Sequence, residues 1–594
     1  MATKPNNIAG VRAAKDNAKP VGGQPANDVE YVTPKPKSAL PDDCPVIPLG
    51  KDEGVRYYLD ADCQLRALAD RDHSRLGILG LFGREHNMLY TYWPRMDRKG
   101  FVTGWRPEQA AEHLMSACSQ KGVWDAAERQ RGRGAWRGEN GELVMHTGDQ
   151  VLQFPATINA WRDRTTGPAG LLGRYVYSRA AAIAAPHNEP VAGGAQGAAG
   201  QLLDLLQTWS WRRPDIDPVL LMGWIGAALV GGALKWRPMI WLTGSKGTGK
   251  STLQDLVKHL FAGGIIQTAD STPAGLWQAL RSQTLPVAFD ELEAEEDNRR
   301  AIAVVKLART ASSGALMLRG GSDHSGKEFV VRSAFLFSSI LIPPLTPQDR
   351  SRISVLDLFE LQLGMAAPRL DPKELGVLGS QLRRRMVDGW YRLPDALDAY
   401  RQALQDRGHS ARSADQIGTL LACADLLMFD NVDDNDGVAI WTPKFDISDQ
   451  ADDDATRDED RCLQHLLSAA IDVHRNGGRK SIAEWVRIAA QADDGDVAEA
   501  NRVLGTYGMK VDTRKDVKRL FVANYHQGLA DLFKGTHWEG RSSTQGVWVQ
   551  ALRRLPGAGP WEKAIYFAGM ICKTTAIPLM VIVPENVPRD RFDL

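Results

Sequence analysis

The sequence lacks the features that would place the chain in a membrane or direct it out of the cell. Its longest apolar run, Val219 to Leu234, is too short and too rich in glycine to predict a membrane span, so we expect a buried helix there. The N-terminus has no apolar core of the kind that a secretory signal requires. We therefore expect a cytoplasmic protein that has no membrane partner.

Cysteine is scarce, and the charges balance. The 594 residues include six cysteines, none of which forms a C-x-x-C pair or has a histidine at zinc-finger spacing. This pattern argues against a disulfide scaffold and predicts free thiols in a reducing compartment. The 72 basic and 72 acidic residues give a formal net charge of +0. Any surface that attracts nucleic acid must therefore be local.

Composition shifts divide the N-terminal part of the chain. Residues 1–45 are rich in Lys, Pro, Asn and Ala and contain few large apolar groups, so they predict a disordered arm. Residues 46–190 alternate strand-like and helical patterns, as in a small α/β domain. The Gly-rich stretch from Glu189 to Gly200 predicts a flexible linker.

The remaining regions differ in pattern and charge. Residues 200–365 alternate apolar strands, glycine-rich loops and helical patterns, which predicts an α/β core. Residues 366–429 are helical in pattern, and residues 430–460 are so acidic that they predict a solvated linker. Residues 461–594 return to a foldable composition and predict a separate C-terminal domain.

The stretch GSKGTGKST carries the strongest chemical signal. An apolar, strand-like run from Met239 to Thr243 precedes it, and a helical pattern continues to Phe261. Strand, glycine-rich loop and helix follow the order of a phosphate-binding loop, whose backbone N–H groups and helix N-terminus attract phosphates. The expected nucleotide-binding residues are Gly244, Ser245, Lys246, Gly247, Thr248, Gly249, Lys250, Ser251 and Thr252.

Two further carboxylates complete a predicted catalytic centre for ATP and Mg²⁺. Lys250 should reach the β and γ phosphates, and Ser251 should ligate Mg²⁺. The next apolar strand delivers Asp290 and Glu291 at its C-terminal end, where ligands bind in an open α/β sheet. We expect Asp290 to complete the metal shell and Glu291 to polarise the attacking water as the general base.

Downstream segments add candidate residues for coupling and catalysis. Strand-like runs flank the turn-rich stretch RGGSDHSGK and predict a β-hairpin that carries His324 and Lys327. The alternative is a plain exposed turn, in which Gly, Ser and Lys are common. The following strand ends in Ser338 and Ser339, either of which could lie between the γ phosphate and the attacking water.

Two arginines stand just before the next predicted strand. An arginine at a subunit edge can stabilise the γ phosphate bound to a neighbouring subunit. Arg352 is the first choice for this role and Arg350 the second. Because such a residue acts across an interface, it implies a closed ring.

The motifs GSKGTGKST, VAFDE, SDHSGK within its hairpin, FLFSS and DRSRI lie within residues 235–360. In these residues the sequence resembles the AAA+ ATPases, and within them the superfamily 3 helicases of viruses, phages and mobile elements. The resemblance implies a hexameric ring that hydrolyses ATP and pulls single-stranded DNA through its pore with the hairpin. It makes Lys327 and His324 the pore residues. The sequence departs from the family where Ser338 and Ser339 replace the usual asparagine.

The pattern of residues 461–594 predicts a winged-helix-like module at the C-terminus. Two helical segments around Tyr525–Phe533 and Gly546–Leu555 precede two strand-like runs, Ala564–Cys572 and Ile577–Val583, which a turn at Lys573–Ala576 separates. Arg553 and Arg554 are candidates for DNA contacts. The alternative is a small α/β domain whose arginines coat one surface.

The complete fold class expected is α/β: a P-loop AAA+ core with a small N-terminal α/β domain and a winged-helix-like C-terminal domain. The favoured function is a DNA helicase or replication initiator of a phage or mobile element, acting in the host cytoplasm, with single-stranded DNA and replication proteins as partners. A nucleotide switch that remodels protein partners and a DNA-binding scaffold assembled by ATP remain alternatives.

Overall fold

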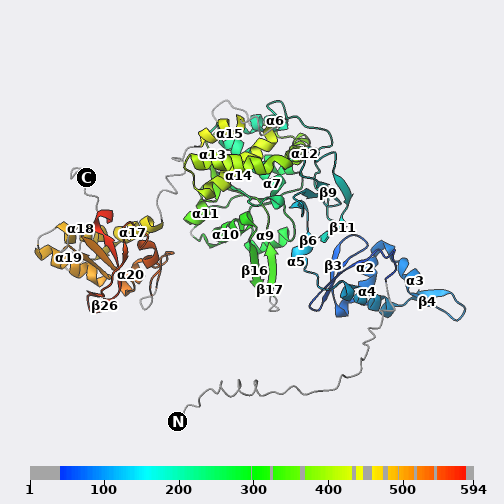
Figure 1. Ribbon diagram of the computed structural model, residues 1–594, viewed down its shortest axis with the longest axis horizontal. Coiled ribbons are helices and arrows are strands. Elements are labelled where there is room, and N and C mark those ends of the chain that lie inside the picture. Colours follow the sequence, from blue (N-terminus) through cyan, green and yellow to red (C-terminus); the bar gives the residue numbers. More distant parts are fainter. Residues whose placement is uncertain are drawn as a thin grey trace, which may run out of the picture. The chain divides into compact units, whose positions relative to one another are not determined.

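The computed structural model describes residues 40–582 apart from 296, 321–325, 361–367, 431–435, 446–457, 473–478, 492–493, 514–517 and 541–544. Residues 1–39 of the expected arm therefore lie outside the described residues. Contacts divide the described chain into two compact units (Figure 1). Unit 1 contains residues 40–131, 148–150 and 168–181, and unit 2 contains the others. Within the described residues, no helix combines the length and apolarity needed to cross a membrane.

Unit 1 is built on a three-stranded antiparallel sheet, as the alternating pattern of this region predicts. Its strands β1 (Ile47–Asp52), β2 (Val55–Leu59) and β3 (Leu65–Ala69) pair in chain order. Three helices follow, α2 (Arg75–Phe82), α3 (Met88–Tyr92) and α4 (Pro107–Lys121). A hairpin of β4 (Pro94–Met96) and β5 (Val102–Trp105) lies between α3 and α4. Helix α4 packs against β1 and β2, and the buried core includes Tyr58, Phe82, Trp93 and Trp105.

A second small sheet completes unit 1. Helix α5 (Ala126–Arg129) leads into β6 (Gln130–Arg131), which pairs with β12 (Tyr175–Tyr177), and β12 pairs with β11 (Gly170–Leu172). The excursion of residues 132–167 into unit 2 is thus interrupted by a brief return to unit 1 at residues 148–150, and the chain returns to unit 1 again at residues 168–181. No composition shift marks these crossings.

That excursion displaces the domain boundary expected near residue 190. The sheet order is β10 (Thr165–Pro168), β9 (Gln150–Phe154), β8 (Leu143–His146), β7 (Gly134–Arg137), and all but end residues of these strands belong to unit 2. Leu143, Leu152 and Phe154 are buried in the large core of unit 2. Thr284 also donates a hydrogen bond from Oγ1 to the carbonyl oxygen of Ala135 at 3.0 Å. These strands belong to unit 2 because their side chains are buried in its core. The composition of the sequence does not show where these side chains are buried.

The segment expected to be a flexible linker is packed against unit 2. Arg385 donates from Nη1 to the carbonyl oxygen of Val191 at 3.3 Å, and the N–H of Gly194 donates to the carbonyl oxygen of Met428 at 2.6 Å. A Cβ on Gly193 would stand 2.8 Å from that same Met428 oxygen. The small residues here permit close backbone approach, so their abundance reflects packing rather than flexibility.

The centre of unit 2 is a five-stranded parallel sheet. Its order is β14 (Ile266–Thr268), β15 (Val287–Phe289), β18 (Phe335–Ser339), β13 (Met239–Gly244), β19 (Ile353–Leu358), and every neighbouring pair is parallel. Parallel strands covered on both faces are apolar throughout, which is why these runs stand out in the sequence. Ile240 and Leu242 enter one buried cluster, while Met239 and Trp241 enter another, as the two-residue repeat of a strand requires.

Helices cover both faces of this sheet. The first cluster is closed by α6 (Ala198–Leu206), α7 (Asp217–Leu229), α8 (Lys250–Phe261), α12 (Pro372–Asp388), α13 (Leu393–Asp406) and α14 (Ala411–Met428). The second is closed by α9 (Pro273–Leu280) and α10 (Arg299–Ser313). Between α10 and β18, strands β16 (Leu316–Gly320) and β17 (Gly326–Val330) form a separate antiparallel hairpin (Figure 1).

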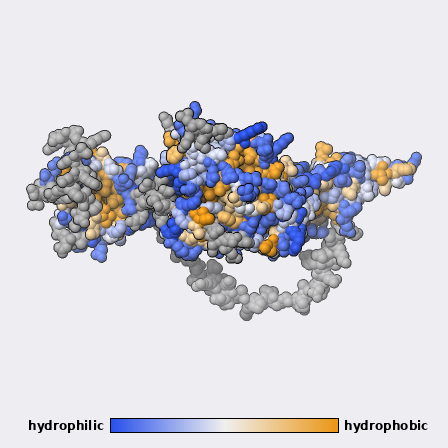
Figure 2. Space-filling model, turned by 90° about the horizontal axis from the view of Figure 1, so that it is seen from above, coloured by the Kyte–Doolittle hydropathy of each residue, from blue (hydrophilic) through white to orange (hydrophobic). Residues whose placement is uncertain are grey.

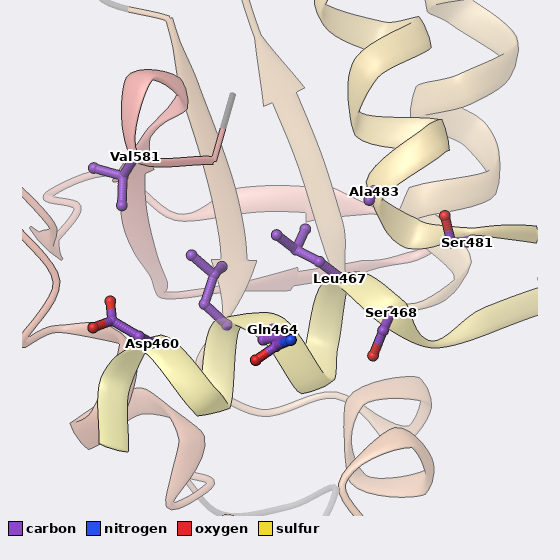
Figure 3. Close-up of a pocket in the computed structure, with 8 residues that line it drawn as sticks. Asp460, Gln464, Leu467, Ser468, Ser481, Ala483 and Val581 are labelled. Atoms are coloured by element: carbon purple, nitrogen blue, oxygen red, sulfur yellow. The ribbon is translucent and has the colours of Figure 1, made fainter. Parts of the chain in front are cut away.

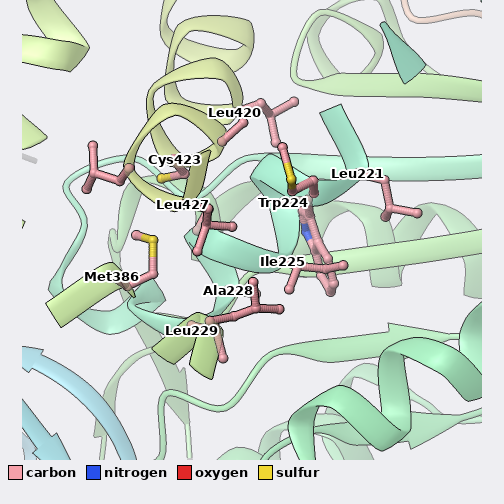
Figure 4. Packing of buried hydrophobic residues seen from close by; sticks show 14 of the residues in the cluster. Leu221, Trp224, Ile225, Ala228, Leu229, Met386, Leu420, Cys423 and Leu427 are labelled. Atoms are coloured by element: carbon pink, nitrogen blue, oxygen red, sulfur yellow. The ribbon is translucent and has the colours of Figure 1, made fainter. Parts of the chain in front are cut away.

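Helix α7 confirms the prediction of a buried helix. All of its residues are buried, and the helix packs closely against α14, where a Cβ on Gly223 would stand 2.0 Å from the carbonyl oxygen of Leu420; Figure 4 shows the surrounding apolar side chains. Trp224 donates from Nε1 to the carbonyl oxygen of Phe335 at 3.1 Å, which joins the helix to the central sheet. An apolar surface on all sides suits a helix enclosed by protein.

The helical region expected at 366–429 is confirmed by α12, α13 and α14, and ordered structure continues into the predicted acidic linker. Helix α15 (Asp436–Trp441) is followed by one 3₁₀ turn, and both Trp441 and Phe445 are buried in the large core. The described part of this linker is therefore anchored. Two aromatic side chains outweigh the acidic composition because their burial removes a large apolar area from water.

The C-terminal domain has its own buried core. Its helices are α17 (Asp458–Ser468), α18 (Ile482–Gln491), α19 (Asp494–Thr506), α20 (Gln527–Leu532), α21 (Trp548–Leu552) and α22 (Leu579–Ile582). The four-stranded antiparallel sheet has the order β22 (Met509–Asp512), β23 (Arg519–Ala523), β27 (Thr574–Pro578), β24 (Gly559–Pro560). Two small hairpins, β20 (Ala470–Asp472) with β21 (Arg479–Ser481) and β25 (Ile565–Phe567) with β26 (Met570–Cys572), complete it.

The final strands of this domain differ from the sequence expectation. The run from Ala564 to Cys572, expected as one strand, folds into the β25–β26 hairpin because Ala568 and Gly569 both adopt positive φ. The expected turn Lys573–Ala576 lies largely in strand β27, and the expected strand after it becomes α22. All six cysteines, including Cys572, are free, as predicted.

Candidate active site

The loop between β13 and α8 has the predicted strand–loop–helix form. Gly249 adopts a left-handed φ of +85°, and a Cβ there would lie 2.8 Å from Nε1 of Trp209. That Nε1 donates to the carbonyl oxygen of Gly249 at 3.1 Å, so the indole holds the loop where α8 begins. Thr248 donates from Oγ1 to the carbonyl oxygen of Ser245 at 3.1 Å and tightens the turn. Only glycine fits this last loop position.

The loop residues divide into an exposed rim and a buried support. Ser245, Lys246 and Gly247 are exposed, whereas the side chain of Thr248 is buried. At the first turn of α8, Ser251 is exposed and Thr252 is half-buried. A rim of exposed backbone at a helix N-terminus is the arrangement that binds an anion.

Lys250 lies across the base of this loop. Its Nζ donates to the carbonyl oxygens of Gly244 at 2.6 Å and Ser245 at 3.0 Å. Burial lowers the pKa of this ammonium, and the nearby carboxylates of Glu293 and Asp290 partly oppose the shift. The lysine expected to bind phosphate is therefore in the field of the two acids that follow β15.

Asp290 is fixed by three hydrogen bonds to a single oxygen. Its Oδ1 accepts from Oγ of Ser338 at 3.0 Å, from Nε2 of Gln254 at 3.3 Å and from the N–H of Glu291 at 3.1 Å. These donors come from β18, from α8 and from the chain just beyond β15. Within the described residues no donor contacts Oδ2, so this oxygen remains available to a cation. The predicted metal ligand and phosphate lysine thus meet at one edge of the sheet.

Gln254 is a site residue that the sequence analysis missed. The side chain is buried, and its Oε1 has no hydrogen-bond partner while its Nε2 donates to Asp290. Residues four apart on a helix share a face, so the spacing from Lys250 could have indicated it. An unpaired buried acceptor next to a carboxylate costs free energy, which favours a role at the site over packing alone.

Glu291 adopts a left-handed backbone conformation, with φ of +56°. Such a conformation costs roughly 1–3 kcal/mol for a residue other than glycine and often marks a functional site. The side chain is exposed beside the buried strand end. Five other described residues besides glycine also have positive φ, so the strain alone assigns no role to Glu291.

Glu293 connects two loops at the same edge of the sheet. Its carboxylate accepts from the N–H of Ile340 at 2.6 Å and from the N–H of Leu341 at 3.1 Å. In the sequence, the acidic run that contains this residue is typical of a solvated helix start, but α10 begins only at Arg299. That interpretation was wrong, because the glutamate ties the segment after β15 to the segment after β18.

The structure separates the two serines that end β18. Ser338 contacts Asp290, whereas Oγ of Ser339 accepts a hydrogen bond from Nε1 of Trp241 at 2.8 Å. Successive side chains of a strand point to opposite faces, so only one of the pair can join the site. Ser338 is therefore the candidate for sensing the nucleotide, and Ser339 belongs to the sheet core.

Arg350 and Arg352 lie away from the site of their own chain. Arg350 ends helix α11 (Pro347–Arg350), and Arg352 directly precedes β19, at the opposite end from Leu358, which pairs with Gly244. The six residues of β19 span about 20 Å. Neither arginine can reach the phosphate loop of the same chain from there, which is consistent with a role only towards a neighbour.

Arg352 is also held within its own chain. Its guanidinium carbon stands 5.5 Å from the centre of the Trp236 ring, and Nη1 donates to the carbonyl oxygen of Arg309 at 3.5 Å. Burial, with the neighbouring cations Arg412 and Arg309, lowers the pKa of this guanidinium. Its Nε is buried without a partner among the described residues.

The predicted hairpin exists as β16–β17. Arg319 pairs with Lys327 across the two strands, so Lys327 stands on a strand close to the tip, and here the structure describes the backbone alone. His324 belongs to residues 321–325, which lie outside the described residues. The existence of the hairpin is confirmed, and the roles of these two residues stay predictions.

The two C-terminal arginines occupy different environments. Arg553 is half-buried and donates from Nε to Oγ1 of Thr575 at 3.3 Å, which ties it to strand β27. Arg554 is exposed. Arg554 can therefore contact a ligand without rearrangement, whereas Arg553 already supports the sheet.

A depression of about 440 Å³ lies in the C-terminal domain between α17, the start of α18 and α22 (Figure 3). It is lined by Asp460, Leu463, Gln464, Leu467, Ser468, Ser481, Ala483 and Val581. None of these residues belongs to the constellation around Asp290. Its lining mixes apolar and polar side chains and includes one carboxylate, Asp460, but no set of titratable groups that converge on one point, so no reaction is assigned to it.

The described residues contain no group of three or more His, Cys, Asp or Glu side chains arranged to hold a metal. In nucleotide enzymes Mg²⁺ is bound by one or two protein oxygens together with substrate phosphates and water. The exposed hydroxyl of Ser251 and the Oδ2 atom of Asp290 supply oxygen ligands of that kind.

No protein-family model matches the sequence, and no curated protein matches it. Among solved structures, the chain is similar to the apo C-terminal region (305–718) of NrS-1, with 11% identity and a TM-score of 0.33 over 89% of this chain and 95% of that chain. The A form of the apo C-terminal region of NrS-1 matches with 12% identity and a TM-score of 0.25 over 57% of this chain and 94% of that chain. Similarities at this level carry no argument about function, which must come from the site.

Proposed function

We propose that this chain is a Mg²⁺-dependent ATPase of the AAA+ type that acts as a DNA helicase or replication initiator of a phage or mobile element. In this proposal it assembles as a ring and translocates on single-stranded DNA. The observation that carries the proposal is the meeting of Lys250, Asp290 and Ser338 at the carboxyl edge of one parallel sheet. In open α/β sheets, this edge is where ligands bind.

In this proposal, each residue of the site has a different role in ATP hydrolysis. The loop N–H groups and Lys250 would hold the β and γ phosphates, while Ser251 and Asp290 would hold Mg²⁺, which neutralises charge on the phosphates. Glu291 stands next to Asp290 with an exposed carboxylate, where it can accept the proton of the attacking water. Ser338 orients Asp290, and in this proposal it responds to the γ phosphate.

Sheet order and an inserted hairpin support the motor assignment. The P-loop strand β13 lies between β18 and β19, and the β16–β17 hairpin enters the chain directly before β18. A conformational change at the γ phosphate can therefore pass through β18 to the hairpin over a few residues. The arginines that precede β19 lie too far from their own site and fit a role at an interface between subunits.

The decisive experiment is a strand-displacement assay on forked DNA, run beside an ATPase assay with and without single-stranded DNA. The proposal predicts ATP-dependent unwinding and a stimulation of hydrolysis by DNA. Hydrolysis without DNA stimulation or unwinding would favour the nucleotide switch that remodels proteins. DNA binding that needs ATP without turnover would favour the scaffold.

A further inference from the structure

Hairpin β4–β5 of unit 1 presents apolar side chains to solvent. The exposed fractions are 67% for Phe101, 50% for Met96 and 48% for Val102. Met96 and Val102 pair directly across the two strands, so their side chains share one face. The hairpin projects from the body of unit 1 beyond α3 (Figure 1), and this end of the unit shows apolar surface among hydrophilic surface (Figure 2).

The tip of this hairpin is fixed by a hydrogen-bonded turn. Oδ1 of Asp97 accepts from the N–H of Lys99 at 2.8 Å and from the N–H of Phe101 at 2.9 Å. The N–H of Asp97 also donates to the carbonyl oxygen of Phe101 at 2.9 Å, and Gly100 turns the chain with φ of +83°. A loop already ordered in this way loses little conformational entropy when it binds a partner.

The charge of the hairpin is positive. Between Pro94 and Trp105 the cations are Arg95, Arg98 and Lys99, all exposed, and the sole acid is Asp97. That acid directs one oxygen into the turn, so the outer surface is dominated by cations. The net charge of the chain is +0, which makes this local excess a distinct feature.

We propose that hairpin β4–β5 binds single-stranded nucleic acid, with Phe101 stacking on a base and Arg98 and Lys99 contacting phosphates. Grooves and fingers that bind single strands combine cations with exposed aromatic rings, because every base has a face on which a ring can stack. The cluster of cations beside the ring favours nucleic acid, because contacts of cations with phosphates are ionic; a protein partner is the alternative that the test below separates by salt dependence. The inference rests on the proposed function for the strand that is bound, and it adds a contact outside the ATPase sheet.

The test uses the full chain without nucleotide and a fluorescein-labelled oligothymidylate, whose anisotropy reports binding. Phe101→Ala should weaken binding by about 5- to 150-fold, the range for loss of one stacked base. The Arg98→Glu, Lys99→Glu double variant should weaken it further and reduce the slope of log affinity against log salt by about 1.4, as expected for two contacts with a single strand. Phe101→Trp should keep the parental affinity, because an indole ring also stacks on a base.

Lys121→Glu is the matched control. Lys121 is exposed and ends α4, whose first residue Pro107 follows the hairpin. The length of α4 places Lys121 about 22 Å from Pro107, so this charge reversal should leave the affinity unchanged. Parental affinity and salt slope in the Arg98, Lys99 double variant would overturn the proposal and leave the apolar face to a protein partner.

The same samples separate this proposal from the proposed function. Basal ATP hydrolysis should be unchanged in all hairpin variants, because none of them touches the residues around Asp290. A Lys250→Ala chain that still binds oligothymidylate through the hairpin would preserve this inference even if ATPase activity were absent from the parent. Unchanged DNA affinity in the hairpin variants, with DNA-stimulated hydrolysis intact, would reject the hairpin contact alone.

Discussion

Ser338 donates a hydrogen bond to Oδ1 of Asp290 at 3.0 Å, from the end of one strand to the end of its neighbour. With the donors from Gln254 and Glu291, this contact fixes which carboxylate oxygen is free to meet a cation. The bond also links β18, which follows the hairpin, to the metal ligand. We expect nucleotide state and hairpin position to be coupled through this pair of residues.

Removal of the Ser338 hydroxyl should weaken the binding of Mg²⁺ at Asp290. Ser338→Ala loses a hydrogen bond to a charged group, a loss of about 1.5–3 kcal/mol. We therefore expect the Mg²⁺ concentration for half-maximal ATPase activity to rise roughly tenfold or more. Ser339→Ala is the control, because its hydroxyl contacts Trp241 instead, and it should alter stability without altering the Mg²⁺ dependence. Equal Mg²⁺ dependence in both variants would argue against the role of Ser338.

The assignment of chemistry predicts different defects at two residues. Lys250→Ala should abolish turnover, since the phosphates lose their main side-chain cation. Glu291→Gln should keep ATP binding and reduce hydrolysis by about 100-fold or more, the usual contribution of a general base. Binding of a fluorescent ATP analogue, measured beside single-turnover hydrolysis, distinguishes the two. Parental hydrolysis in Glu291→Gln would show that the base is wrongly assigned.

An arginine that acts across an interface should be complemented by a neighbour. Arg352→Ala and Lys250→Ala should each lack activity alone, whereas a mixture should recover part of it. Mixed rings contain interfaces at which an intact Lys250 site meets an intact Arg352. Arg350→Ala, mixed in the same way, tests the second choice. Mass measurement with an ATP analogue should show a ring, most simply a hexamer, and a strict monomer would exclude the mechanism.

The hairpin of the ATPase sheet should couple hydrolysis to DNA. Lys327→Ala should leave basal hydrolysis intact, lower DNA-stimulated hydrolysis and unwinding, and flatten the salt dependence of single-strand binding by about 0.7 units of slope, as expected for one contact. His324→Ala should affect coupling more than salt response, because an imidazole stacks or hydrogen-bonds. Unchanged unwinding by the double variant would return this loop to an ordinary exposed turn.

Helix α12 should tolerate a methyl group at one glycine and reject it at another. A Cβ on Gly379 would stand 1.8 Å from the carbonyl oxygen of Leu260 in α8, so Gly379→Ala should destabilise the fold by about 1–3 kcal/mol or more and weaken ATP binding. At Gly376 the nearest atom is the Cβ of Ala262 at 4.0 Å. Gly376→Ala should therefore raise the free energy of unfolding by up to about 1 kcal/mol, through helix propensity, and raise the melting temperature with it. Thermal unfolding of the two variants side by side provides the comparison.

Local patterns in the sequence were enough to predict the centre of the site. The strand, loop and helix from Met239 to Phe261, the strand that delivers Asp290 and the β16–β17 hairpin all appear where the pattern indicates. These features depend on neighbouring residues: glycine at a left-handed position, a helical stripe and an apolar run before a polar residue. For the same reason α7 was predictable as a buried helix.

Tertiary structure decided which distant residues join these elements. Gln254 and Glu293 enter the site, and Ser338 is separated from Ser339, only because parallel strands bring their carboxyl ends to one edge. Strands β7 to β9 pack with unit 2, and the Gly-rich stretch before α6 is tied to α12 and α14, since the buried area and the hydrogen-bond partners are supplied by residues far away in the chain. Composition reports on local solvation and propensity, whereas domain membership and site geometry depend on long-range contacts that no short pattern encodes.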